Sequence, residues 1–340
     1  MRKTLLNYIC CPFCHGTLDF ITKVYENGEK NIQEGILICQ KCQRWFPVRN
    51  YIPELLPDHL RNWEADENFL YSLDLNIEKK ILKKIKKKIK HCRKNALKIK
   101  DSGVSYKKSE ISIKKKVSDP NFFGPGYFSP FNPHNTDFTM QLIRRFGNAV
   151  PLLNPKQHDI ILDLGCGYAW TTEWLKKMGT EPIGIDICRT YLDIGIERMG
   201  KNIPPLIVAD TENLPIKKEC VDAILCYDAF HHIPDRKKTM GHFNRTLKIN
   251  GNIVLTEPGL DHEAAAPSQE AMKKYGILEK GMSLSEVKDY CEKLTLLKPQ
   301  QHFIIKCSSN EQENYLSPQF IQSHSFIDEQ IFVINKINKP

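Results

Sequence analysis

The sequence predicts an α/β protein built on a doubly wound, mostly parallel sheet, with a small cysteine-rich module in front of it. From about residue 136 onward, short apolar runs suited to buried strands alternate with helical segments, which is typical of a parallel α/β sheet. Before residue 57, two Cys-x-x-Cys pairs stand in a stretch too short to bury a large core. A Lys-rich stretch separates the two regions.

Composition divides the 340 residues into three predicted parts. These are a module over residues 1–57, a Lys-rich helical connector over residues 58–135 and an α/β domain over residues 136–340. The net charge of +9 belongs to the connector, because residues 78–116 hold 17 basic against three acidic residues, or +14, which leaves −5 elsewhere. The chain has no apolar run of about 18 residues and no secretory signal pattern, so we expect a cytoplasmic protein without a transmembrane segment.

The α/β domain is expected to hold about seven strands, the last of them antiparallel. The strand-like runs are Ile160–Leu164, Pro182–Asp186, Leu206–Ala209, Ala223–Tyr227, Asn252–Glu257, Phe303–Cys307 and Gln330–Asn335. Helices are expected near residues 171–178, 190–200 and 236–248, and over Ser283–Leu294. This alternation places the ends of successive parallel strands at one edge of the sheet, where ligands bind in such folds.

The connector is expected to contain one amphipathic helix, from roughly Asn76 to Lys98. Isoleucines and other apolar residues recur there at helical spacing, and lysines fill the other face. The isoleucines would pack on a neighbouring domain while water solvates the lysines. Alternatively, the lysine face would contact nucleic-acid phosphates or an anionic membrane. Residues 101–118 lack this periodicity and are expected to form a loop.

Four cysteines in the N-terminal module have the spacing of a metal site. Cys11 and Cys14 form one Cys-x-x-Cys pair, and Cys39 and Cys42 form a second pair 24 residues later. Two such pairs supply four thiolates at the tetrahedral spacing that structural zinc requires. Metal binding would also provide much of the folding free energy of so small a module. The alternative is a redox-active or merely buried quartet of thiols.

Residues 3–57 resemble the small zinc-ribbon activator subunits that partner tRNA and protein methyltransferases. The resemblance rests on Leu5-Leu6, on Cys11-Pro12-Phe13-Cys14 followed by Gly16-Thr17-Leu18, on the second cysteine pair and on Phe46-Pro47-Val48 with Ile52-Pro53. Such modules are also found fused ahead of bacterial methyltransferase domains. The resemblance therefore implies structural support or substrate presentation, without naming a substrate.

A glycine-rich turn follows the first strand of the α/β domain. Gly165 and Gly167 allow the backbone to turn sharply and to approach a ligand closely. Asp186 ends the second strand, 21 residues after Gly165, at the distance typical of an acid that binds the hydroxyls of a ribose. Asp210 ends the third strand, in a position to accept a hydrogen bond from an adenine amino group. The sequence lacks the Gly-x-Gly-x-x-Gly motif of dinucleotide-binding enzymes, because Trp170 stands at the position of the third glycine.

Residues 136–258 resemble the class I methyltransferases that use S-adenosylmethionine and have a Rossmann-like sheet. The resemblance rests on Asp163-x-Gly-x-Gly followed in order by Asp186, Asp210 and Asp222-Ala-Ile-Leu. Ala169 departs from it, since many members have a glycine there. The resemblance implies roles for individual residues: Asp163, Gly165 and Gly167 line the methionine part of the cofactor, Asp186 holds the ribose, Asp210 and Thr211 flank the adenine, and the backbone of Cys226 lies near the sulfonium.

The candidates for catalysis lie just past the fourth strand, in the segment Asp228–Asp235. His231 and His232 each carry a side chain whose ordinary pKa, about 6.5, suits it to accept a proton from an acceptor hydroxyl. An alternative is a divalent-cation site. Some quinone O-methyltransferases carry Glu-x-x-Glu-His here, and Asp228, His231 and His232 fall on those positions with chemically competent ligands.

Three functions are compatible with these observations. The segment from Glu257 to Glu279 resembles methyltransferases of glycan pathways and favours O-methylation of a sugar, a lipid-linked glycan or another small metabolite. The zinc ribbon and the Lys-rich residues 78–116 favour RNA methylation instead. The third possibility is a non-catalytic zinc-ribbon scaffold. The acceptor atom, the oligomeric state and the position of the ribbon relative to the substrate stay open.

Overall fold

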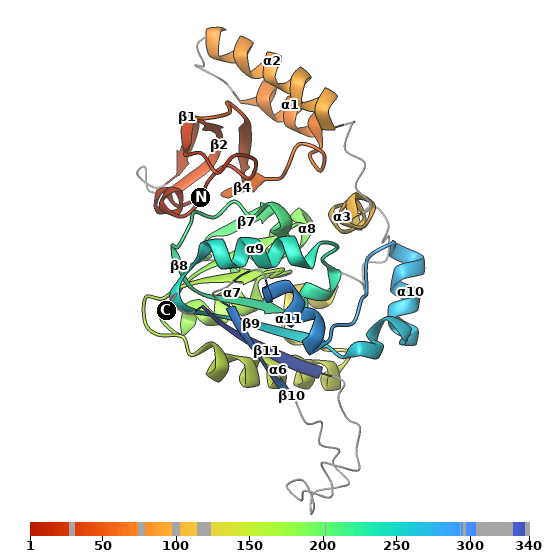
Figure 1. Ribbon diagram of the computed structural model, residues 1–340. Coiled ribbons are helices and arrows are strands. Elements are labelled where there is room, and N and C mark those ends of the chain that lie inside the picture. Colours follow the sequence, from red (N-terminus) through yellow and green to blue (C-terminus); the bar gives the residue numbers. More distant parts are fainter. Residues whose placement is uncertain are drawn as a thin grey trace, which may run out of the picture.

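A computed structural model describes residues 1–26, 31–73, 79–96, 103–113, 124–200, 202–292, 294, 297–303 and 329–336. In this part of the chain, one sheet of eleven strands runs through the molecule in the order β1-β2-β3-β4-β7-β6-β5-β8-β9-β11-β10 (Figure 1). The strands are β1 (Leu18–Glu26), β2 (Asn31–Cys39), β3 (Trp45–Arg49), β4 (Ile52–Leu55), β5 (Ile160–Leu164), β6 (Glu181–Asp186), β7 (Leu206–Ala209), β8 (Val221–Tyr227), β9 (Leu247–Pro258), β10 (Leu297–Phe303) and β11 (Glu329–Lys336).

Helices connect and cover these strands. The α-helices are α1 (Trp63–Ser72), α2 (Lys79–Ala96), α3 (Gly103–Ile111), α6 (Thr136–Leu153), α7 (Trp170–Lys177), α8 (Arg189–Met199), α9 (Arg236–Thr246), α10 (Ala266–Tyr275) and α11 (Leu284–Glu292). The 3-10 helices are η1 (Lys3–Asn7), η2 (Gly124–Phe128), η3 (Thr211–Asn213), η4 (Phe230–His232) and η5 (Leu260–Ala264). None of the described helices has both the length and the apolar character needed to cross a bilayer.

Strands β5 to β11 confirm the predicted α/β fold. β5 lies at the centre, parallel to β6 on one side and to β8 on the other. The last strand, β11, is antiparallel to both of its neighbours, β9 and β10, as predicted. The predicted strand Phe303–Cys307 lies outside the described residues except for Phe303. In its place, the structure has the edge strand β10, which begins at Leu297 and ends at Phe303. β10 is mostly polar and pairs only with β11 among the described strands.

The N-terminal module extends the same sheet, so the strand count is eleven rather than about seven. β4 pairs in parallel with β7, with Glu54 opposite Val208 and Leu55 opposite Ala209. β7 would otherwise be an edge strand with unpaired backbone groups, and β4 covers that edge. A second backbone contact joins Ile9 to Ile216 as an isolated bridge. The module is therefore built into the sheet of the α/β domain.

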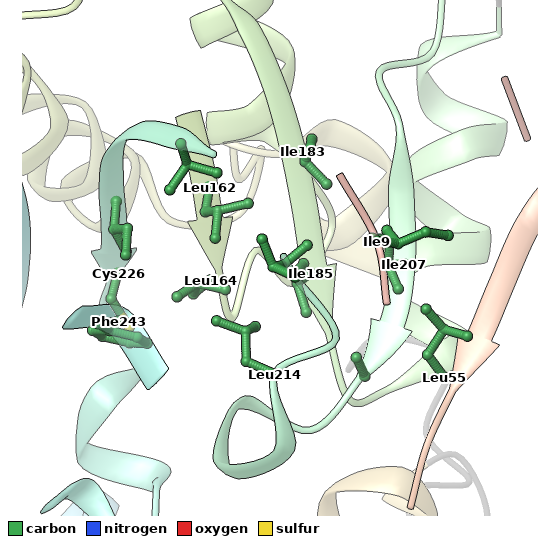
Figure 2. Close-up of a cluster of buried hydrophobic side chains, with 14 of the residues drawn as sticks. Ile9, Leu55, Leu162, Leu164, Ile183, Ile185, Ile207, Leu214, Cys226 and Phe243 are labelled. Atoms are coloured by element: carbon green, nitrogen blue, oxygen red, sulfur yellow. The ribbon is translucent and has the colours of Figure 1, made fainter. Parts of the chain in front are cut away.

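The two parts also share one hydrophobic core. Ile9 and Leu55 come from the module and lie among Ile185, Ile207 and Leu214 of the α/β domain (Figure 2). Ile9, Leu55, Ile185, Ile207 and Leu214 are all at most 1% exposed. Burial of one such side chain stabilises the fold by about 1.5–3 kcal/mol, so the contact between module and domain contributes substantially to folding.

Alternate residues of the central strands point to opposite faces of the sheet, and each face has its own helices. Leu162 and Leu164 face a core that also contains Phe243 of α9 and Val287 of α11. Ile161, the residue before Leu162 in sequence, faces a second core. That core contains residues of α6 and α7: Phe146, Ala149, Leu153, Trp170 and Leu175.

The described part of the connector contains three α-helices, α1 to α3, and the 3-10 helix η2. In α2, Ile85, Ile89 and Cys92 are buried, and both isoleucines pack in a cluster with Trp45 of the module and Phe69 of α1. This confirms the predicted amphipathic helix between Lys79 and Ala96, while the rest of its predicted range lies outside the described residues. The opposite face exposes Lys83, Lys86, Lys87, Lys90 and Lys94. Figure 1 shows α1 and α2 beside the N-terminal strands.

The predicted loop over residues 101–118 is wrong for its central part, which forms α3. This helix has no apolar stripe of regular period, so its sequence gave no helical signal. Val104 and Ile111 pack against a core that contains Leu56, Leu60 and Leu192. Tertiary packing therefore stabilises a helix that local periodicity does not predict.

Candidate functional site

A cavity of about 310 Å³ lies at the C-terminal ends of the central parallel strands. Gly165 and Gly167 line it after β5, Asp186 at the end of β6, Asp210 and Thr211 after β7, and Cys226, Asp228 and His232 at and after β8. The structure thus brings seven of the nine predicted cofactor and catalytic residues to one cavity. Asp163 and His231 lie behind its wall and are not among the lining residues.

The glycine turn after β5 has the backbone shape that only glycine adopts easily. Gly165 and Gly167 have φ angles of +66° and +51°, in the left-handed region. A Cβ added at Gly165 would lie 2.3 Å from the Cβ of Ala229, so no side chain fits there. A Cβ added at Gly167 would meet nothing within 4 Å. The turn therefore leaves space beside the backbone, as a close approach by a ligand requires.

Asp163 holds the start of α7 from below this turn. Its carboxylate is fully buried, and one oxygen, Oδ2, accepts hydrogen bonds from the hydroxyls of Thr171 (2.6 Å) and Thr172 (2.5 Å). The other oxygen, Oδ1, is buried without a hydrogen-bond partner among the described residues. Burial raises the pKa of Asp163 to about 6. Oδ1 is thus an unpaired oxygen behind the cavity wall, and the Asp163 carboxylate fixes the start of α7 without lining the cavity.

Asp186 is oriented by backbone amides at the end of β6. Its Oδ2 accepts a hydrogen bond from the N–H of Gly167 (2.8 Å), and its Oδ1 accepts one from the N–H of Cys188 (2.7 Å). Burial raises the pKa of Asp186 to about 6. Each oxygen keeps a further lone pair, so the fixed carboxylate is able to accept hydrogen bonds from two hydroxyls in the cavity.

Asp210 is held more tightly than the sequence suggests. Its Oδ1 accepts a hydrogen bond from the N–H of Glu212 (3.1 Å), while Oδ2 contacts the side chain of Asn213 (2.7 Å) and the ammonium of Lys107 (3.0 Å).

Cys226 is fully buried, and this burial raises the pKa of its thiol well above the ordinary value. The Cys226 thiol is therefore neutral where it meets the cavity.

His231 serves the structure of the loop after β8. Its Nδ1 lies 2.7 Å from Oε2 of Glu257, and its Nε2 lies 3.5 Å from Oε2 of Glu279. Glu257 also accepts hydrogen bonds from the backbone N–H groups of Phe230 (2.9 Å) and His231 itself (3.1 Å). Burial acts to lower the pKa of His231, but the two carboxylates outweigh it and raise this pKa to about 10. His231 is thus a cation at neutral pH, clamped between two acids.

His232 is neutral, in contrast to the cationic His231. Its Nδ1 donates a hydrogen bond to the carbonyl oxygen of Leu278 (2.5 Å), which leaves Nε2 with a lone pair. Burial, assisted by the positive charge of His231, lowers the pKa of His232 to about 4. The ring is therefore neutral at pH 7, and it lines the cavity. Of the two predicted histidines, His232 is the one placed to accept a proton.

The arrangement disfavours the predicted divalent-cation triad of Asp228, His231 and His232. Asp228 lies 3.2 Å from the guanidinium of Arg145. Around this loop, among the described residues, the ligand atoms that lie within 4.8 Å of one another belong to His231, His232 and Glu279 instead. Both ring nitrogens of His231 are engaged by carboxylates, Nδ1 by Glu257 and Nε2 by Glu279.

Sequence reasoning missed four residues that build this site. Lys107, Glu110 and Glu279 line the cavity, and Glu257 organises the loop after β8. Glu257 and Glu279 bound the segment predicted to form the substrate wall, so a partial signal existed for them. Lys107 and Glu110 fell in the predicted loop, and no sequence signal marked them.

The four module cysteines converge as predicted for a metal site. The Sγ atoms of Cys11 and Cys42 are 3.7 Å apart, those of Cys14 and Cys39 are 3.4 Å apart, and all four lie within 4.8 Å of one another. Four thiolates at about 2.3 Å from a tetrahedral zinc ion would be separated by about 3.8 Å. The donor set and the spacing fit structural zinc.

Comparison with known proteins agrees with this description. Residues 162–255 match the family model of a methyltransferase domain, and residues 2–50 match the model of Trm112p-like proteins. The Trm112p-like match thus precedes the methyltransferase-domain match in the chain. A geranyl diphosphate C-methyltransferase from Streptomyces coelicolor A3(2) shares the fold, with a TM-score of 0.50, 12% identity and coverage of 68% of this chain and 98% of that one.

Two curated relatives match parts of the methyltransferase region. A demethylmenaquinone methyltransferase from Staphylococcus saprophyticus is 33% identical over 110 residues, which are 31% of this chain and 47% of the relative. Phosphoethanolamine N-methyltransferase 1 from Zea mays is 28% identical over 198 residues, which are 56% of this chain and 35% of the relative. The chain thus spans less than half the length of these relatives.

Proposed function

We propose that this chain is an S-adenosylmethionine-dependent methyltransferase that acts on a small acceptor. One observation carries the proposal: the glycine turn, two buried aspartates and a neutral histidine meet in one cavity at the C-terminal edge of the methyltransferase sheet. The bound cofactor would supply a methyl group that its sulfonium has already activated. The protein's task is then to hold both reactants in line and to exclude water, and such alignment is worth about 7–11 kcal/mol.

The residues present fit this cofactor. The open space beside Gly167 suits the charged methionine part, and Asp163 would act from behind the cavity wall by fixing the start of α7. The fixed carboxylate of Asp186 suits the two ribose hydroxyls. Asp210 and Thr211 line the part of the cavity that would hold the adenine, and Cys226 lines the same cavity.

His232 would accept the proton that the acceptor loses. Its Nε2 carries the lone pair, and its ring is neutral at pH 7. A group with so low a pKa is a weak base, and the nearby carboxylates of Glu279 and Asp228, which act to raise this pKa, offset only part of the effect of burial. His231 would instead fix the loop after β8 as a permanent cation.

The preferred acceptor is a hydroxyl of a sugar, a glycan or another small metabolite. Glu110, Asp228 and Glu279 come from three different parts of the chain and offer hydrogen-bond acceptors around the cavity. Carboxylates in such an arrangement bind the several hydroxyls of a polyol by accepting their hydrogens. Two relatives are named for small-molecule methylation, of a quinone precursor and of phosphoethanolamine. These names support a small acceptor without deciding its class.

Binding and transfer test the proposal in two stages. Titration calorimetry with S-adenosylmethionine should show saturable heat, and its absence would favour the scaffold alternative. Transfer of labelled methyl groups is then measured with sugars, hydroxylated metabolites, primary amines and total RNA as separate acceptors. His232→Ala should reduce turnover about 10²–10⁴-fold, whereas His158→Ala, at an exposed position far from the cavity lining, should not. Methylation confined to amines or RNA would overturn the hydroxyl assignment.

RNA methylation is the second candidate, and one observation favours it. α2 exposes five lysines on the face opposite its buried isoleucines. If RNA bound this face through its phosphates, its affinity for the chain would fall steeply as the salt concentration rises from 50 to 200 mM. RNA binding of this kind, lost when Lys83, Lys86, Lys87, Lys90 and Lys94 are changed together to Gln, would support it. Salt-insensitive turnover on a sugar would refute it.

A further inference from the structure

α3 belongs to the connector and lies outside both family matches, which cover residues 2–50 and 162–255. Nevertheless, Lys107, Glu110 and Ile113 from this segment line the cavity. Residues three apart lie on the same face of a helix, so α3 turns its Lys107–Glu110 face toward the site. Val104 and Ile111, three and four residues from Lys107, lie on the adjoining face of the helix and pack on the core. The connector thus supplies one wall of the cavity.

Lys107 is the most tightly held residue of this wall. Its side chain is 5% exposed, and its ammonium lies 3.0 Å from Oδ2 of Asp210 and 2.6 Å from Oε2 of Glu212. Both acids are also buried, with side chains 2% and 3% exposed. Loss of the Lys107 cation would leave two buried carboxylates uncompensated, which is a severe penalty in a protein interior.

The two acids belong to a network that spans two loops. Asp210 and Glu212 lie in the loop after β7, where Asp210 also holds Asn213. The second oxygen of Glu212 accepts a hydrogen bond from the backbone N–H of Asp235 (2.9 Å). Asp235 follows η4, the turn that carries His232, and caps α9. The ammonium of Lys107 therefore sits at the junction between the loop after β7 and the loop after β8.

We propose that Lys107 is a positioning residue of the active site. From α3, it fixes the loop that would hold the adenine against the loop that carries His232. The inference rests on the proposed function, since it assigns Lys107 to the binding of that cofactor. Lys107 itself takes no part in methyl transfer and acts through Asp210 and Glu212.

The test compares two variants that each remove a buried cation. Lys107→Met removes the proposed positioning residue. Arg61→Met removes a cation that is 2% exposed and lies 2.8 Å from Asp66, next to α1 and outside the cavity lining. Dissociation constants for S-adenosylhomocysteine are measured by calorimetry, and melting temperatures are measured on the same samples. Both variants should melt at lower temperature than the wild type.

Only Lys107→Met should weaken cofactor binding, by about tenfold or more, which corresponds to about 1.4 kcal/mol. Lys107→Arg keeps the charge and should restore binding to within about threefold. If Lys107→Met fails to fold, the double variant Lys107→Met with Glu212→Gln removes one of the uncompensated charges and should fold while still binding weakly.

The outcomes separate the two proposals. If the wild-type chain binds S-adenosylhomocysteine and Lys107→Met binds it within twofold as tightly, Lys107 is merely structural and this inference is overturned alone. The same holds if Arg61→Met weakens binding as much as Lys107→Met, because the effect then follows stability. If the wild-type chain shows no binding, the proposed function fails and the inference fails with it.

Discussion

The ion pair between Glu257 and His231 predicts that a substitution of Glu257 strongly destabilises the fold. Glu257 is 1% exposed, accepts hydrogen bonds from the backbone amides of Phe230 and His231, and pairs with the His231 ring. Glu257→Gln keeps the shape of this side chain but removes its charge and turns one acceptor into a donor. The variant therefore leaves a buried imidazolium with only Glu279 as a partner, and it sets an amide N–H₂ against backbone N–H groups.

The expected cost is about 3–5 kcal/mol, the range found when one partner of a buried ion pair is removed. Folded proteins are stable by only about 5–15 kcal/mol, so Glu257→Gln should lose a fifth or more of the total. The sign of the pH dependence follows from the raised pKa of His231. Its stabilisation is complete below about pH 6.5 and is lost as the pH rises through about 10. The difference between wild type and variant should shrink over that range.

Urea unfolding of both proteins at pH 7 and at pH 10 measures this difference. Asp289→Asn serves as the control, because Asp289 pairs with Lys237 at 3.0 Å while both side chains are about half exposed. Such a surface pair contributes at most about 1 kcal/mol. In parallel, NMR of imidazole-labelled protein follows the titration of His231. A loss below 1 kcal/mol at pH 7, together with a His231 pKa near 6.5, would refute the ion-pair reasoning.

Three further predictions follow. Leu55→Ala should cost about 3–5 kcal/mol and lower the stability of module and domain in one transition; two separate transitions by tryptophan fluorescence would contradict the shared core. Purified protein should contain about one zinc ion per chain, and Cys39→Ser should lower both its metal content and its melting temperature; unchanged melting would exclude a structural ion. At saturating cofactor, whose ribose hydroxyls would donate to Asp186 and keep it ionised, kcat should stay flat from pH 7.5 to 6 and fall only near pH 4–5, where His232 is protonated; a half-maximum at pH 6.5 would contradict the lowered pKa of His232.

The sequence predicted the parts of the molecule that local pattern determines. The apolar run of β5 and the glycine turn after it were placed correctly, because strand periodicity and the demands of a positive φ are properties of a few neighbouring residues. The cysteine pairs were equally predictable, because metal geometry fixes their spacing. The approach of Asp186, Asp210 and His232 to one cavity followed from the rule that parallel strands end at the same edge.

Contacts between distant segments were beyond the sequence. β4 is only four residues long and pairs with β7 about 150 residues later, and no local feature of Ile52–Leu55 specifies that partner. α3 has no apolar stripe, and its inward face is held by the ion pairs of Lys107. The charge states of His231 and His232 depend on Glu257, Glu279 and the carbonyl of Leu278. These groups are distant in sequence and contact the histidines only in the folded protein.

The two adjacent histidines show how the fold assigns different roles to the same residue type. The ordinary pKa of histidine made His231 and His232 equal candidates for the base. In the structure, two carboxylates fix a proton on His231, and this positive charge in turn disfavours a proton on His232. The backbone carbonyl of Leu278 then selects the His232 tautomer whose Nε2 lone pair is open. The ion pair that stabilises the loop thus also keeps His232 neutral. Because Glu257→Gln weakens the hold of His231 on its proton, it should raise the pKa of His232 as well as destabilise the fold.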